Sequence, residues 1–122
     1  MRFGAATTGI TYSSQSGTYT KIGDTVRISA YILLTSKGTA TGNVDFTGLP
    51  FNVAIGNPNY AAFSWHLNGV SFNGFPNGWG VTNSNQISLG QTTDAGAHSN
   101  LTNANFTNGS GIIITGIYRT LA

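Results

Sequence analysis

The stretch that decides the fold class is residues 25–35, Thr25-Val26-Arg27-Ile28-Ser29-Ala30-Tyr31-Ile32-Leu33-Leu34-Thr35. Side chains alternate along it with the two-residue period of a β-strand. The sequence places these side chains on one face: Val26, Ile28, Ala30, Ile32 and Leu34. The opposite face begins polar and becomes apolar at Tyr31 and Leu33. We therefore expect another surface to cover that end of the second face.

A matching pattern closes the chain. Ile112, Ile114 and Tyr118 alternate there with a second set of side chains, Ile113, Thr115, Ile117 and Arg119. Both strands are thus predicted to be partly buried on two sides. The candidate subunit-interface residues are Tyr31, Leu33, Ile113 and Ile117.

Shorter strands are predicted between these two. They fall at residues 18–22, 43–47, 60–67, 79–82 and 86–90. Turn signals recur between them every eight to twelve residues, a spacing typical of an antiparallel β-sandwich or barrel. Three Asn-Gly pairs lie within residues 68–78, so a compact loop is predicted over residues 68–80. Residues 101–107 predict one helical turn, capped by Thr102 or Asn103.

The composition supports an all-β class. Gly, Ser, Thr and Asn make up 58 of the 122 residues, there is no Glu, and there are only two Lys. Long helices are disfavoured, because Gly is costly in a helix and the small polar side chains compete for its backbone hydrogen bonds. The length fits a single domain over residues 1–122. With no Cys for disulfides, burial between subunits is the remaining common way to stabilise so Gly-rich a chain.

The distribution of charged and apolar residues argues against two kinds of partner, nucleic acid and membrane. The formal net charge is +2, and the five basic residues are scattered along the chain. Nucleic-acid binding needs a concentrated basic surface, so we expect no nucleic-acid partner. No apolar stretch of 18 residues occurs, so no membrane insertion is expected.

Catalytic and metal chemistry are not expected either. Glycoside hydrolysis ordinarily needs two carboxyl groups, and the chain offers only Asp24, Asp45 and Asp94, two of them in turn or surface contexts. His66 and His98 lie 32 residues apart, without the close ligand spacing of zinc sites and without a partner that would mark a catalytic triad. The sequence therefore predicts a protein that is not an enzyme, with no catalytic residue, metal or cofactor.

Recognition of a ligand by the surface remains. Residues 73–79 interleave two large aromatic side chains with amides, and the candidate ligand contacts there are Asn73, Phe75, Asn77 and Trp79. Such side chains can stack on sugar rings and hydrogen-bond hydroxyls. Tyr60 and His66 are second choices. The alternative interpretation is that Phe75 and Trp79 only fill the end of the sandwich.

Several segments in order carry a family resemblance. They are residues 3–12, then Gly17-Thr18-Tyr19-Thr20-Lys21-Ile22-Gly23-Asp24, Ser36-Lys37-Gly38 through Thr41-Gly42-Asn43, Gly48-Leu49-Pro50-Phe51, residues 101–107, and Gly116-Ile117-Tyr118-Arg119. Together they resemble the C-terminal domains of bacteriophage tail-fibre and related virion-fibre proteins. Residues 53–98, which include the aromatic loop, match nothing in that family. Residues 1–16 resemble the segment through which the chain enters this domain in the family, where it is the end of a longer fibre.

The resemblance implies a β-sandwich of jelly-roll type that assembles as a homotrimer. It also implies a virion protein, assembled in the cytoplasm of the host bacterium, that contacts other virion proteins and attaches to a host-surface glycan or protein. A purely structural virion module, such as a head fibre, a capsid decoration or a trimerising cap, is the alternative. A monomeric microbial carbohydrate-binding module is the second alternative.

Overall fold

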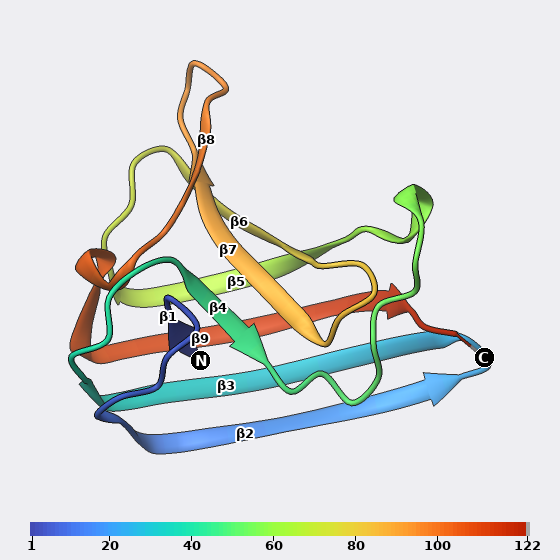
Figure 1. Cartoon of the computed structure of the whole chain (residues 1–122), viewed down its shortest axis with the longest axis horizontal. Helices are drawn as coiled ribbons and strands as arrows, with labels where there is room; N and C mark the ends of the chain where they lie inside the picture. The colour runs from blue at the N-terminus through green and yellow to red at the C-terminus, as the bar shows by residue number, and fades with distance from the viewer. Residues whose placement is uncertain (122) are drawn as a thin grey trace.

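The computed structural model describes residues 1–121, of which 62% are strand and none is α-helix (Figure 1). All strand pairs are antiparallel. The strands are β1 (Arg2–Phe3), β2 (Ile10–Ile22), β3 (Thr25–Lys37), β4 (Val44–Thr47), β5 (Ala61–Val70), β6 (Phe75–Gly80), β7 (Gln86–Thr92), β8 (His98–Asn100) and β9 (Phe106–Arg119). Two 3₁₀ turns are present, η1 (Asn57–Asn59) and η2 (Asn103–Asn105). The predicted all-β class and antiparallel pairing are confirmed.

The strands form one curled sheet in the order β1-β4-β7-β6-β5-β9-β3-β2, with β8 paired to β7. The curl is centred on β5, because its first residues, 61–63, pair with β6 and residues 64–70 pair with β9. The long strands β2, β3, β9 and β5 run side by side, and β4 and β7 cross over them (Figure 1). Strand β5 thus joins two parts of the sheet. One part contains β9, β3 and β2, and the other contains β6, β7, β4 and β1.

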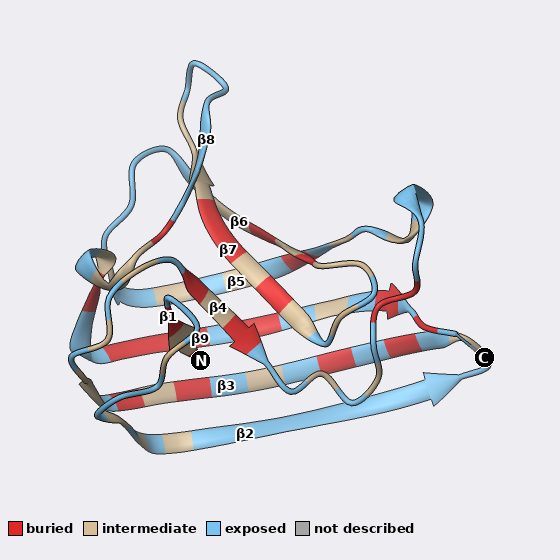
Figure 2. Cartoon of the chain, viewed as in Figure 1, coloured by how far each residue is buried: buried red, intermediate tan, exposed pale blue. Residues whose placement is uncertain are grey.

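The core lies between these two parts. The first face predicted for residues 25–35 is confirmed, since Val26, Ile28, Ile32 and Leu34 are all buried. Strand β9 adds a second set from its inner face, Ile112, Ile114 and Tyr118. The crossing strands supply Val44, Phe46, Ile87 and Leu89. Strand β2 lies beyond this cover and is exposed along most of its length (Figure 2).

Residues 1–16 are integrated into the sheet. Phe3 is fully buried and its ring lies 5.3 Å from that of Phe106. Arg2 pairs with Asp45 across β1 and β4, with two hydrogen bonds of 2.6 and 2.8 Å. Strand β2 begins at Ile10, eight residues before the start predicted from the sequence.

The predicted compact loop over residues 68–80 is wrong. Residues 75–80 form strand β6, and Asn77-Gly78 lies inside it rather than at a turn. The physical reason is packing: a Cβ on Gly78 would lie 2.6 Å from Cζ2 of Trp65. Glycine is needed at position 78 because the Trp65 indole and the Ser88 carbonyl oxygen both lie against the backbone there, not because the chain turns.

The predicted helical turn is confirmed as η2. Thr102 caps it, accepting a hydrogen bond from the Ala104 N–H at 3.3 Å. The Asn105 side chain accepts from the Thr102 N–H at 2.8 Å, which completes a capping box.

We expect Gly116→Ala to destabilise the protein by about 1–3 kcal/mol, because overpacking forces side chains out of place. A Cβ on Gly116 would lie 3.0 Å from Cε1 of the buried Phe63 ring. Chemical denaturation at one fixed protein concentration measures the change.

The matched control is Gly17→Ala. A Cβ on Gly17 meets nothing closer than 3.6 Å, so this variant should be as stable as the parent or slightly more stable. Equal stability of the two variants would contradict the packing of Phe63 on Gly116.

Candidate functional site

Three of the sequence-predicted ligand contacts share one outer face. Successive side chains of a strand point to opposite faces of the sheet. Along β6 this puts Phe75, Asn77 and Trp79 on the face away from the core, opposite the face of the buried Gly78 and Gly80. Strands β7 and β8 add Thr92 and His98 to the same face, where the two are directly opposite. We call Phe75, Asn77, Trp79, Thr92 and His98 the aromatic–amide patch.

Short contacts join the members of this patch. The ring centroids of Trp79 and His98 lie 5.2 Å apart in an edge arrangement. The Asn77 Nδ2 donates to Thr92 Oγ1 at 2.8 Å, and Thr92 Oγ1 lies 3.3 Å from His98 Nδ1. The Asn77 Nδ2 also donates to the Phe75 carbonyl oxygen at 3.4 Å, whereas the Phe75 residue remains 64% exposed.

The place of His98 depends on Gly90. A Cβ at position 90 would lie 2.5 Å from Cε1 and 2.6 Å from Nε2 of the imidazole. The ring therefore lies directly on the β7 backbone, next to Trp79. Sequence reasoning missed Thr92 and His98 as patch residues, because only the register of β7 and β8 brings them beside β6.

The other sequence candidates lie elsewhere. Asn73 precedes β6, and its backbone N–H donates to Gln91 Oε1 at 2.6 Å. Tyr60 follows η1, which lies apart from the β7–β8 hairpin, at the right of the view (Figure 1). His66 is opposite Ile113 on the outer face of the long strands. Tyr60 and His66 are thus not part of the aromatic–amide patch.

The four candidate interface residues share the outer face of the long strands. Tyr31 pairs directly with Ile113, Leu33 lies opposite Gly111, and Ile117 lies opposite Arg27. Tyr31 and Ile113 are about 40% exposed, and Ile117 is 59% exposed. We call Tyr31, Leu33, Ile113 and Ile117 the outer apolar face.

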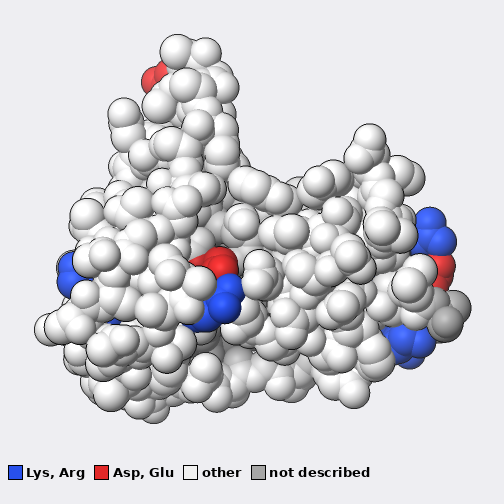
Figure 3. All heavy atoms as spheres, viewed as in Figure 1, with Lys and Arg blue, Asp and Glu red and all other residues white. Residues whose placement is uncertain are grey.

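Charged side chains are few, and four of the eight form ion pairs. Arg119 donates two hydrogen bonds to Asp24 Oδ2, at 2.5 and 3.2 Å, and these hold the pKa of the Asp24 carboxyl below its ordinary value. Asp45 is paired with Arg2, whereas Asp94 lies in the loop of the β7–β8 hairpin. Large uncharged areas separate these groups (Figure 3). Within residues 1–121 no three His, Cys, Asp or Glu side chains form a group that could hold a metal ion.

Comparison with family models, curated proteins and solved structures finds no match. No helix in the described part of the chain is long and apolar enough to cross a membrane. The aromatic–amide patch and the outer apolar face are therefore defined by the positions of their side chains alone.

The aromatic–amide patch can offer apolar ring surface beside hydrogen-bonding groups. Phe75 presents an accessible ring, and Trp79 a partly accessible one. Asn77, Thr92 and His98 supply donors and acceptors next to them. This combination suits a polyhydroxylated ring, which has apolar C–H faces and polar edges.

We expect Gly90→Ala to displace the His98 ring from Trp79, because the added Cβ would overlap the imidazole. The NMR shifts of the His98 ring protons, which lie near the indole, should move towards those of an exposed histidine. The control is Gly109→Ala, where a Cβ meets nothing within 4 Å. Unchanged His98 shifts in Gly90→Ala would contradict this packing.

Proposed function

We propose that this chain is a bacteriophage virion-fibre domain that assembles as a homotrimer and attaches the virion to the host bacterial surface. Attachment would be non-enzymatic, through a surface glycan or protein. The family resemblance of the sequence motifs suggests this class. In the virion the domain would also contact other virion proteins.

The outer apolar face carries the proposal. Its four side chains lie on one sheet face, where Tyr31 pairs directly with Ile113, and Tyr31, Ile113 and Ile117 are exposed in residues 1–121. Large apolar side chains exposed together on a sheet face favour a protein–protein contact, and identical copies are its simplest source. The two parts of the curled sheet, which enclose one core, support the jelly-roll sandwich that the family resemblance implies.

The aromatic–amide patch supports the attachment role. It lies on β6, β7 and β8, away from the face proposed for assembly on β3 and β9. Three copies would therefore present three patches without covering them. Linked binding of this kind raises avidity by about 10²–10⁴ over a single site.

A specific observation favours a purely structural module as the second candidate. The polar groups of the patch already pair with one another, Asn77 with Thr92 and Thr92 with His98. A trimerising cap or capsid decoration needs no free donors there. The two functions differ in whether an intact trimer binds host cells.

We expect light scattering to give three times the 12.7 kDa chain mass. Ile113→Lys should dissociate the trimer, because a charge opposite Tyr31 would have to be buried at the interface. Ile55→Lys is the control, since Ile55 is also an exposed isoleucine but lies outside the outer apolar face. A parent protein that is monomeric at micromolar concentration would overturn the assembly and favour the carbohydrate-binding module.

We expect Phe75→Ala to reduce binding of the trimer to host cells by at least about tenfold, because the loss is repeated at each linked site. Trp79→Ala should act in the same direction. Phe72→Ala is the control, since Phe72 is also exposed but precedes the patch strands. A parent trimer that binds neither cells nor a glycan array would favour the structural module.

A further inference from the structure

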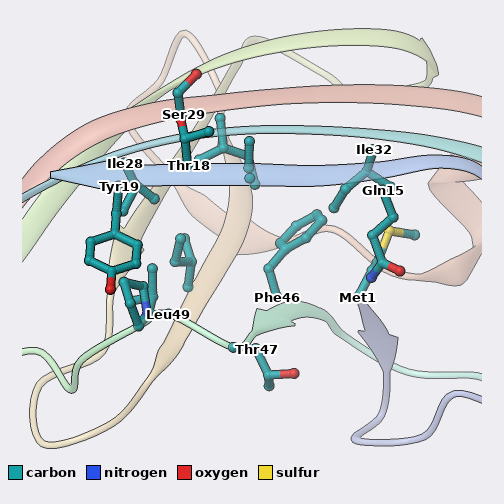
Figure 4. Close-up of a pocket in the computed structure, with 16 residues that line it drawn as sticks. Met1, Gln15, Thr18, Tyr19, Ile28, Ser29, Ile32, Phe46, Thr47 and Leu49 are labelled. Carbon is teal, nitrogen blue, oxygen red and sulfur yellow. The ribbon is translucent and has the colours of Figure 1, made fainter.

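A cavity of about 290 Å³ lies between the two parts of the sheet, beside the exposed strand β2 (Figure 4). Its walls come from both parts and include Gln15, Gly17, Ile28, Phe46, Leu49 and Ile114. The aromatic–amide patch and the outer apolar face contribute none of these six. The cavity is therefore a separate feature of the molecule.

The cavity exists because two small residues, on neighbouring strands, lie opposite each other in its wall. Gly17 of β2 pairs with Ala30 of β3, on the inner face of the sheet. A Cβ on Gly17 would have only Ser29 O at 3.6 Å and the Ala30 Cβ at 3.7 Å as close neighbours. Room for a larger side chain is thus present and left unfilled.

Two larger side chains of β2 border this gap. Tyr19 extends from β2 towards Leu49 at one end of the cavity, and Gln15 extends towards Met1 at the other (Figure 4). Tyr19 also meets the ring of Phe51 edge-on at 5.6 Å. The result is a slot with apolar side chains from both parts of the sheet, open to solvent along β2.

The chemistry of the walls selects a neutral ligand. No Asp, Glu, Lys or Arg side chain lines the slot, whereas Ile28, Phe46 and Leu49 make it mostly apolar. The amino group of Met1, also a lining residue, donates to the Tyr12 hydroxyl at 3.4 Å, and burial lowers its pKa and so favours its neutral form. The Gln15 amide makes no side-chain hydrogen bond to any of residues 1–121, so its donor and acceptor can serve a ligand at the rim. An apolar cavity of about 150 Å³ holds benzene, and this one is close to twice that size.

We propose that the slot binds a neutral, flat molecule of about two fused rings that carries one hydrogen-bonding group at its edge. The rings lie against Phe46 and the isoleucines, and the polar group meets the Gln15 amide. This site is independent of the proposed attachment function, so either can fail without the other.

Titration of the full chain with 2-naphthol, followed by the fluorescence of the naphthol, tests the site. Saturable binding at one site per chain is expected. Gly17→Val should raise the Kd at least about tenfold, because its side chain occupies the slot. Thr20→Val, on the opposite face of the same strand, should leave the Kd unchanged. No saturable binding, or equal binding by Gly17→Val that remains folded by circular dichroism, would overturn the proposal.

A second variant tests the polar contact. Gln15→Leu should weaken binding of 2-naphthol and leave the Kd of naphthalene, which has no hydroxyl, nearly unchanged. Equal Kd values of Gln15→Leu and the parent for 2-naphthol would overturn the contact. Binding that disappears as protein concentration and oligomer size rise would mean that a neighbouring copy fills the slot, and would overturn the small-molecule assignment.

Discussion

Contact between aromatic rings and glycine backbone holds the curled sheet closed. Phe63 lies on Gly116, and Trp65 lies on Gly78, so neighbouring inward-facing side chains of β5 each require a glycine in a different strand. Gly116 belongs to β9, one of the long strands, and Gly78 to β6, which pairs with the crossing strand β7. Strand β5 therefore fixes how closely the two parts approach. A side chain at either glycine would push them apart and open the core that they enclose.

The chain covers only one side of its longest strands. The crossing strands bury the inner face of β3 and β9, but they do not extend over β2. This leaves two uncovered regions of different character. The outer apolar face carries Tyr31 beside Ile113, which suits another protein surface. The slot beside Gly17 is a concavity of about 290 Å³ with mostly apolar walls, which suits a small molecule.

Local periodicity explains which parts of the fold could be predicted from the sequence. The inner and outer faces of residues 25–35 follow from alternation alone, and so do those of Ile112 to Tyr118, because a strand's two faces are set by adjacent residues. The Asn77-Gly78 pair misled the prediction, since its glycine serves a contact with Trp65 that is distant in sequence. The same limit applies to the candidate site. Phe75, Asn77 and Trp79 alternate locally, whereas His98 joins them only through the register of β8.

The internal hydrogen bonds of the aromatic–amide patch bear on how strongly it could bind. A ligand hydroxyl that engages Asn77 or Thr92 must replace a bond of 2.8 Å that the protein already makes. The exchange gains little, because one hydrogen bond is lost for each one formed. Net affinity at one site would then come mainly from the rings of Phe75 and Trp79. Under the proposed function, such a weak site becomes useful only when several copies act together, so attachment through the patch requires the assembly that the outer apolar face would provide.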